Sequence, residues 1–572
     1  MTRTGLAVRR FQFFLSKIIW IWRRRCNPRE LVCLDFKCIH FFVEKKRSLL
    51  NNGLGEERPT KFSRRSSPAS SPSPAHTPSS THSAPITMDE VNGALGHSMA
   101  SLTLVTNDPR MHAEKVRRKL PARLRSLPVV KSVPAAPVVP ENFMPRVFVF
   151  GTGEQAELGL GDEMLLRKRP MPLLAVDGCR PALIGTGGQT GFVAGENGEL
   201  YSWGTSDSYA LGRPTLENWK NMAQVLRRQG RLSESKSLEA MHEQLVTEFV
   251  PGHVHHPDLD ALRVVKFACG DAFSVLLTEI GTVYQCGMFR FGEGNIESST
   301  LTEFTLIQGL EQHSVVDIAA GANHVLAVTD RGIVFSWGNG DQSQFGRRVS
   351  QRRHVAQARL NIGIHPERVP LDAPIVSVGA GDYHSLAVSQ SGELYAWGMN
   401  TFGQLFFGQG ESDFISLPQR VTALENVRIV SATGGAKHSL AVSDSGQVYS
   451  VGRCDSGQLG IPDNVRLATQ EHNQATQSGA VYVPCQVTGI PGRVIQISSA
   501  TDHNIAVCED GSAYTWGYGD QCALGTGGED DEFQPVRLQG QKLEGWHVVQ
   551  GVAEGQHTFV LAVQPNPATN GA

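Results

Sequence analysis

The chain has 572 residues, and its 53 Lys and Arg nearly balance its 55 Asp and Glu. The charge is divided unevenly, because residues 1–145 carry 24 basic and 10 acidic side chains, whereas residues 146–572 carry 29 and 45. A cationic region joined to an anionic body indicates two different kinds of partner. The 10 cysteines include no Cys-x-x-Cys pair. This excludes a disulfide-dense secreted module, and we expect neither a metal site nor a cofactor.

Residues 1–145 are predicted to form a basic, largely disordered extension. The apolar stretch at 11–22 falls short of the roughly 18 residues that cross a bilayer, so we expect no membrane partner. The first acid, Glu30, follows eight Arg and Lys, a composition also found in mitochondrial transit peptides. Initiation at Met88 or Met111 is a further reading, so the sequence leaves open whether residues 1–87 belong to the mature protein.

Ser, Thr, Pro and Ala dominate residues 64–85, which fits either a spacer or a target of proline-directed kinases. A dense basic patch follows, typical of a nuclear import signal or of an arm that binds nucleic-acid phosphates. A solvated charge run is the alternative reading. We expect a nuclear, chromatin-associated protein with salt-dependent binding, with a mitochondrial or cytoplasmic location as the minor alternative. The patch consists of Lys115, Arg117, Arg118, Lys119, Arg123 and Arg125.

Residues 146–563 contain an internal repeat. Its clearest copy, at 374–405, reads PIVSVGAGDYHSLAVSQSGELYAWGMNTFGQL. Five further copies begin near residues 181, 264, 315, 429 and 494, while 146–161 and 547–563 are complementary half-copies. Period-two alternation around Ser-Gly turns is typical of antiparallel hairpins.

Six whole units and two halves predict an all-β, seven-bladed propeller that closes by pairing the N- and C-terminal half-units. Radial stacking would bury the faces of sheets that are marginal alone. An open solenoid is the alternative, although it would not need complementary ends. Residues 564–572 are then a short tail, and 215–262 are an insertion whose first part, from Leu216 to Leu226, has helical spacing.

Two motif positions recur in the repeat. The tryptophans of Trp-Gly are predicted to pack between blades rather than to stack on a ligand. The histidine of Gly-x-x-His is read first as a loop anchor, because residues that recur with the structural period are usually structural. Tryptophan stands at Trp203, Trp337, Trp397 and Trp516, and histidine at His324, His384, His438, His503 and His557, with Thr190 and Phe273 at the other two histidine positions.

The Trp-Gly ending and the Gly-x-x-His-Ser-Leu-Ala-Val strand resemble the repeat of the regulator of chromosome condensation family. Because that repeat serves many roles, it implies the fold and little about function. Residues 287–296 are similar to the β-wedge that the founding member inserts into the GTPase Ran. The exit at 341–348 and the ending LGTGGEDDEFQPV at 524–536 also resemble that protein. Together with the basic arm, these features resemble a fungal-type guanine-nucleotide exchange factor for Ran.

The resemblance assigns GTPase-binding roles to particular positions. The functional acid of the first half-blade falls on Glu154, and that of the third blade on Asp271. Asn323 replaces the fourth-blade acid, so a charge-dependent role there is in doubt. The family histidines are kept as His438 and His557, while Thr190 departs from the pattern. The wedge positions are Phe289, Arg290, Glu293 and Gly294.

We find no phosphate-binding loop, nucleophile elbow or metal cluster in the sequence, so no covalent chemistry is expected. The expected function is nucleotide exchange on Ran at chromatin, in support of nuclear transport and mitotic regulation. A noncatalytic propeller scaffold for protein–protein interaction is the alternative. An ultraviolet receptor built on the same repeat is disfavoured, because the Gly-Trp-Arg-His-Thr sequence of such receptors is absent.

Overall fold

The computed structural model describes residues 128–135, 137–228, 246–291, 294–295, 300–348, 365–408, 412–466 and 479–565. The basic patch at 115–125, the Ser/Pro segment and Glu293 lie outside the described residues, so the expectations placed on them stay predictions.

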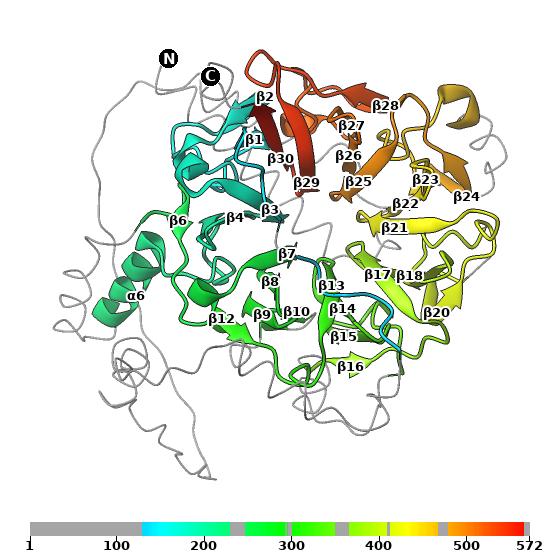
Figure 1. Ribbon diagram of the computed structural model, residues 1–572, viewed down its shortest axis with the longest axis horizontal. Coiled ribbons are helices and arrows are strands. Elements are labelled where there is room, and N and C mark those ends of the chain that lie inside the picture. The colour runs from blue at the N-terminus through cyan, green and yellow to red at the C-terminus, as the bar shows by residue number, and fades with distance from the viewer. Residues whose placement is uncertain are drawn as a thin grey trace, which may run out of the picture. The chain divides into compact units, whose positions relative to one another are not determined.

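The described body consists of seven four-stranded antiparallel sheets arranged in a ring (Figure 1). We number these sheets as blades 1 to 7 and give their strands from the inside of the ring outward. Blade 1 contains β29 (His547–Glu554), β30 (His557–Pro565), β1 (Phe143–Thr152) and β2 (Leu166–Pro172). Blade 2 contains β3 (Pro181–Gly187), β4 (Thr190–Gly195), β5 (Leu200–Gly204) and β6 (Gly252–His253). Blade 3 contains β7 (Val264–Cys269), β8 (Phe273–Thr278), β9 (Val283–Gly287) and β12 (Leu301–Leu306).

The remaining four blades follow the same order. Blade 4 contains β13 (Val315–Ala320), β14 (His324–Thr329), β15 (Val334–Gly338) and β16 (Glu367–Arg368). Blade 5 contains β17 (Ile375–Ala380), β18 (His384–Ser389), β19 (Leu394–Met399) and β20 (Phe414–Arg420). Blade 6 contains β21 (Ile429–Gly434), β22 (His438–Ser443), β23 (Val448–Arg453) and β24 (Ala480–Gln486). Blade 7 contains β25 (Val494–Ser499), β26 (His503–Cys508), β27 (Ala513–Gly517) and β28 (Glu532–Arg537).

The ring closes through blade 1, which takes strands from both ends of the repeat region. β1 pairs with β30 from Phe143 opposite Pro565 to Gly151 opposite His557. The predicted seven-bladed propeller is therefore confirmed, and the open solenoid is wrong. The predicted boundaries at 146 and 563 are slightly short, because the pairing extends to 143 and 565.

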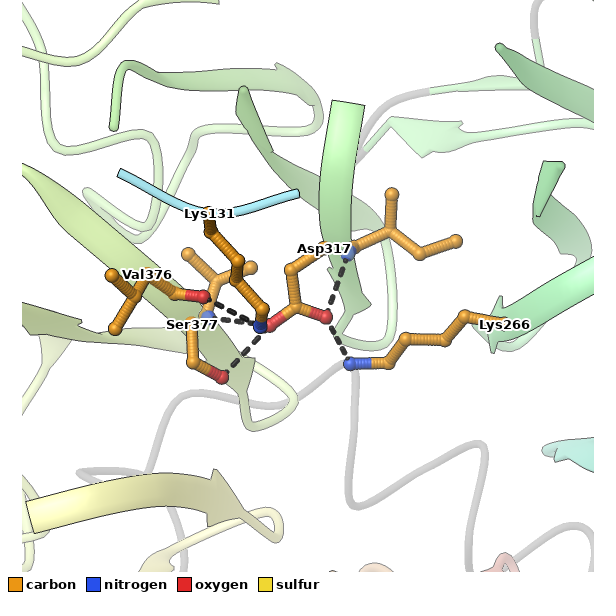
Figure 2. A network of polar contacts seen from close by, with 7 residues as sticks. Lys131, Lys266, Asp317, Val376 and Ser377 are labelled. Carbon is orange, nitrogen blue, oxygen red and sulfur yellow. Dashed lines mark hydrogen bonds and ion pairs between the residues drawn. The ribbon is translucent and has the colours of Figure 1, made fainter. Parts of the chain in front are cut away.

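Part of the predicted N-terminal extension belongs to the body. The Val130 N–H donates to the Asp330 carbonyl at 2.8 Å, and the Val139 carbonyl accepts a bond from Arg180 at 3.2 Å. Lys131 Nζ donates to the Val376 carbonyl at 2.9 Å (Figure 2). The predicted extension up to residue 145 is thus too long, since polar groups of the described residues from 128 onward bond to blades 2, 4 and 5.

Lys131 reaches a buried carboxylate that joins three blades. Asp317 on β13 accepts from Lys266 of blade 3 at 2.5 Å and from the Ser377 hydroxyl of blade 5 at 2.8 Å (Figure 2). Burial alone would raise the pKa of Asp317. The ammonium groups of Lys266 and Lys131 outweigh it, so the pKa lies below its ordinary value. Asp317 therefore stays ionised, because the ammonium groups of Lys266 in blade 3 and Lys131 in the N-terminal segment offset the cost of burying its charge.

The tryptophans pack between blades, as predicted. All four are fully buried. Trp203 Nε1 donates to the Glu157 carbonyl of blade 1 at 2.7 Å, and Trp397 Nε1 donates to the Gln344 carbonyl of blade 4 at 2.8 Å. Each indole thus fills the space between neighbouring sheets while its single donor is satisfied by the preceding blade.

The insertion in blade 2 begins with α6 (Leu216–Arg228), where helical spacing predicted a helix. The Asn218 N–H donates to the Thr215 hydroxyl at 3.2 Å, which caps the helix. Figure 1 shows α6 outside β6. The described residues also form three short 3₁₀ helices: η2 (Leu174–Cys179), η4 (Leu259–Ala261) and η6 (Asp520–Cys522). Among the described residues, no helix has the length and apolar character needed to cross a membrane.

Candidate functional site

The propeller has two ends that differ in sequence. In blade 5, His384 at the start of the second strand lies opposite Gly398 at the end of the third. The loop after Trp-Gly therefore lies beside the Gly-x-x-His loop in each blade. We call this end the loop face, and we call the end formed by the turns between second and third strands the hairpin face. The inner loops of the loop face are 187–190, 270–273, 321–324, 381–384, 435–438, 500–503 and 554–557.

Backbone contacts explain the glycine of Trp-Gly. In every blade the N–H after this glycine donates to the carbonyl before the histidine position, at 2.7–3.0 Å. The turn that brings these groups together has φ between 87° and 116°. A Cβ at Gly398, for example, would lie 2.7 Å from the Tyr383 carbonyl oxygen. The seven glycines are Gly151, Gly204, Gly287, Gly338, Gly398, Gly452 and Gly517.

Five inner-loop histidines, those of blades 4, 5, 6, 7 and 1, each tie their blade to the next one. Ser385 Oγ already donates to the Gln344 carbonyl at 2.8 Å, so Nε2 of His324 must carry the proton that the two share. The same direction holds for His438, because its partner is the acceptor-only Oδ1 of Asn504. The distances are 2.9 Å for His324–Ser385, 2.7 Å for His384–Ser439, 2.7 Å for His438–Asn504, 2.9 Å for His503–Thr558 and 2.6 Å for His557–Thr186.

These histidines are neutral and inaccessible. Burial lowers the pKa of His557 to about 3, and it also lowers the pKa of His438. Both side chains are fully buried. The expectation that they contact a GTPase is therefore wrong, and they instead hold neighbouring blades together beneath the loop face. The geometry therefore supports a structural role for the recurring histidine.

The loop face carries carboxylates in two kinds of loop: the inner loops, and the loops that follow the Trp position of each blade. The fourth residue after the Trp position is acidic in five blades, and that position holds Arg290 in blade 3. The inner loops contribute four further acids. The outer acids are Glu154, Asp207, Asp341, Asp455 and Asp520, and the inner acids are Asp271, Asp382, Asp502 and Glu554.

The predicted contact residues lie on this face with different exposure. Glu154 is exposed in the loop between β1 and β2. Asp271 is half-buried, and its N–H donates to the Ala322 carbonyl of blade 4 at 3.0 Å. Asn323, only 9% exposed, is largely covered. Burial raises the pKa of Glu554 well above its ordinary value, and the carboxylates of Asp382 and Asp271 raise it further. Carboxylates from blades 3 and 5 therefore act on the buried Glu554 of blade 1 at the loop face.

The predicted wedge is a two-stranded hairpin formed by β10 (Arg290–Phe291) and β11 (Gly294–Asn295). Arg290 pairs with Asn295, and Phe291 pairs with Gly294. The hairpin rises from the loop face, because the Met288 N–H before it donates to the Ala272 carbonyl at 2.9 Å, next to Asp271. The predicted wedge and Asp271 thus share one face.

Phe289 corrects the predicted wedge. The resemblance places it in the wedge, yet it is 1% exposed and contacts Phe273 with ring centroids 4.6 Å apart. Phe273 stands where most blades have histidine, so blade 3 replaces a hydrogen bond with an aromatic contact. Phe289 therefore anchors the base of the hairpin rather than its tip.

On the hairpin face, acidic side chains of the turns form salt bridges. Arginines that precede the inner strands pair with the glutamates of the turns: Arg180 with Glu196 at 2.7 Å, and Arg263 with Glu279 at 3.0 Å. On the loop face, Glu154, Asp207 and Asp341 make no salt bridge with a described residue. Unneutralised carboxylates attract a basic surface more strongly than paired ones, so the loop face is the candidate binding surface.

A central channel of about 340 Å³ runs between the inner strands and ends near Asp382 and Glu554. Over the part of the chain that the structure describes, no three or more His, Cys, Asp and Glu side chains are grouped so that they could hold a metal ion.

Residues 146–560 match the family model described as the RCC1-like domain. The chain belongs to this family. Protein pim1 from Schizosaccharomyces pombe is 32% identical over 471 residues, covering 79% of this chain and 82% of pim1. Guanine nucleotide exchange factor SRM1 from Saccharomyces cerevisiae is 30% identical, covering 70% of this chain and 84% of SRM1. The crystal structure of Prp20p from Saccharomyces cerevisiae has a TM-score of 0.64 at 27% identity, covering 77% of this chain and 94% of that chain.

Sequence reasoning missed several acids of the loop face of this RCC1-like chain. Asp207, Asp382 and Glu554 were not singled out, although Asp207 shares with Glu154 the fourth position after the Trp site. That shared offset was the available signal. Glu554 carries no such signal, because it stands where most inner loops have glycine.

The neutral histidines predict acid sensitivity. His324, His384, His503 and His557 have a pKa of about 3 when folded, against 6.5 for an ordinary histidine. The unfolded chain then binds more protons, so stability falls as the pH drops below 6.5. At pH 5 each histidine should cost about 2 kcal/mol. Thermal melts at pH 7.5 and 5 should show this loss, and it should shrink in His384→Gln but not in the exposed control His547→Gln. A loss that is unchanged in His384→Gln would contradict the account.

Proposed function

We propose that this protein is a guanine-nucleotide exchange factor for the GTPase Ran and that it acts through the loop face. The observation that carries the proposal is the β10–β11 hairpin, which rises beside Asp271 from a face rich in carboxylates. Membership of the RCC1-like family and the similarity to an exchange factor, SRM1, support the same function.

The mechanism requires binding and no covalent step. A GTPase holds its nucleotide through a phosphate-cradling loop with cationic groups and Mg²⁺. A hairpin that displaces this loop, together with carboxylates that attract its cations, weakens nucleotide binding. By linkage, nucleotide must weaken the binding of the exchange factor by the same factor. The factor therefore accelerates GDP release without selecting the incoming nucleotide, and the cellular excess of GTP sets the direction.

The residues have separable roles in this mechanism. Asp271 supplies negative charge at the base of the hairpin, and Glu154 supplies it from blade 1. Phe289 and Phe273 fix the hairpin to the body through their buried contact. His438 and His557 act only indirectly, by holding the inner loops in place. The scaffold alternative would apply if a folded protein bound partners on this face without accelerating GDP release.

A release assay with fluorescent GDP on Ran tests the contact assignments. Asp271→Asn keeps the side-chain shape and removes the charge. The loss of a charge-assisted contact of roughly 1.5–3 kcal/mol should lower exchange efficiency about ten- to a hundredfold. Arg290→Ala should also reduce exchange.

Trp397→Ala is the control for unfolding, because removal of a buried aromatic side chain costs about 3–5 kcal/mol. It should lower the melting temperature, whereas the two loop-face variants should melt like the parent. If Asp271→Asn and Arg290→Ala both fold normally and release GDP at the parent rate, the contact assignment is wrong.

We further propose nuclear, chromatin-associated localisation through the basic patch at 115–125. Prp20p, the structural neighbour, was studied for its binding to Gsp1p and histones, and the patch of this chain has the charge needed for nucleic-acid phosphates. The docked segment from residue 128 onward fixes where this arm leaves the body.

Deletion of residues 1–127 leaves Lys131 in place and so separates the arm from the fold. The truncated protein should lose nuclear retention, and its binding to nucleosomal DNA should lose its steep dependence on salt. Its melting temperature and its exchange activity on Ran should not change. Unaltered retention together with unaltered salt dependence would show that the arm has no such role.

A further inference from the structure

The interface between blades 3 and 4 departs from the repeat by changing from polar to apolar. In blades 4 to 7 the histidine bonds to the residue that follows the histidine position of the next blade, as His384 does to Ser439 at 2.7 Å. In blade 3 the histidine position holds Phe273, and the facing position of blade 4 holds Val325. Both side chains are fully buried. Because both partners of the hydrogen bond are replaced together, neither position leaves a polar side chain unsatisfied.

The tryptophan of blade 4 also has a different hydrogen-bond partner. In three other blades the indole N–H donates to a backbone carbonyl of the preceding blade, at 2.7–3.2 Å, and this carbonyl lies six residues after the glycine of Trp-Gly. In blade 3 that stretch of the chain forms the β10–β11 hairpin. Trp337 Nε1 donates instead to Oε1 of Gln285 on β9, at 2.9 Å. The wedge hairpin thus takes the place in the chain of a loop that joins neighbouring blades elsewhere.

Phe289 packs into the interface that these changes leave apolar. Its ring centroid lies 4.6 Å from that of Phe273, and a Cβ at Gly338 of blade 4 would lie 3.0 Å from its Cε1 atom. Phe289 directly precedes Arg290, where β10 begins. The base of the hairpin is therefore held by both blades. One buried apolar cluster contains Phe273, Phe289, Val325 and Trp337.

We propose that Phe273, Val325 and Gln285 are positioning residues for nucleotide exchange, because they make this interface an apolar socket that fixes the orientation of the wedge hairpin. The inference rests on the proposed function and adds to it buried residues that act through Phe289. The other blades show that a histidine bond suffices to join two sheets, so the apolar interface is explained by the hairpin. A hairpin that is fixed at its base avoids the cost of being ordered when it binds the GTPase.

The full-length double variant Phe273→His/Val325→Ser tests the socket, since it restores the polar pair of the other blades and removes apolar contacts of Phe289. It should melt at a higher temperature than either single variant, because each single change buries a polar group without its partner. The maximal rate of GDP release from Ran should nevertheless fall about tenfold or more. The concentration that gives half of this rate should change less, because the carboxylates of the loop face are untouched.

Hydrogen exchange in the free protein gives a second readout, which does not depend on Ran. The Met288 N–H donates to the Ala272 carbonyl at 2.9 Å, at the base of the hairpin. Peptides that contain residues 287–291 should exchange about tenfold or more faster in the double variant and in Phe289→Ala than in the parent. Phe289→Leu keeps an apolar side chain and should restore most of the protection and most of the release rate.

Phe148→Ala is the matched control for the loss of core volume. Phe148 of blade 1 is also 1% exposed, and its ring centroid lies 5.3 Å from that of Trp546. Phe148→Ala and Phe289→Ala should both lower the melting temperature. In assays well below those temperatures, only Phe289→Ala should slow GDP release and speed hydrogen exchange of the hairpin.

Two results would overturn the positioning role. One is a maximal release rate equal to that of the parent in both Phe289→Ala and the double variant. The other is an equal loss of release rate in Phe148→Ala, because general destabilisation would then explain the effect. If the parent itself does not accelerate GDP release, the proposed function is wrong. Hairpin exchange in the free protein would still decide on the socket, and unchanged exchange in the double variant would refute it.

Discussion

The hydrogen bond between each inner-loop histidine and the next blade is the interaction on which the loop face depends. It joins neighbouring sheets, together with the indole N–H bonds and the contacts of Asp317, and it is made at the end of the ring where the inner loops emerge. His384 bonds to Ser439, and Ser439 follows directly after His438, which bonds onward to Asn504. The inner loops are thereby fixed relative to one another. Since a ring of rigid loops can present charges at defined positions, a structural motif prepares a binding surface without contacting the partner.

The treatment of charge distinguishes the two ends of the propeller. On the hairpin face, arginines neutralise the turn glutamates, and the segment from residue 128 onward packs near Asp317. On the loop face, acids recur at two positions of the repeat, and part of them make no salt bridge with a described residue. Both ends thus carry acids, but Glu154, Asp207 and Asp341 of the loop face make no salt bridge with a described residue, whereas Asp455 and Asp502 on the same face share Arg453. The wedge hairpin rises from the loop face.

The fold was predictable from sequence because each blade repeats the same residues at the same spacing. Complementary half-units predicted the closure, and Trp-Gly predicted the packing between blades. The site was predictable only in part. Asp271 and the hairpin lie where expected, whereas His438, His557 and Phe289 are buried. The identity of a residue does not show whether its side chain points into the interface between two blades or into solvent. Lys131 was missed because the carbonyl that its ammonium group bonds to, at Val376, is 245 residues away in the sequence.

Hydrogen exchange measured by mass spectrometry on the full-length protein, with and without nucleotide-free Ran, tests the central claim that the loop face binds the GTPase. The account predicts slower exchange in peptides that cover residues 187–190, 205–208 and 270–273. Peptides from the hairpin face, such as 196–199 and 330–332, should exchange at the same rate in both states. Protection confined to the hairpin-face peptides would contradict the account.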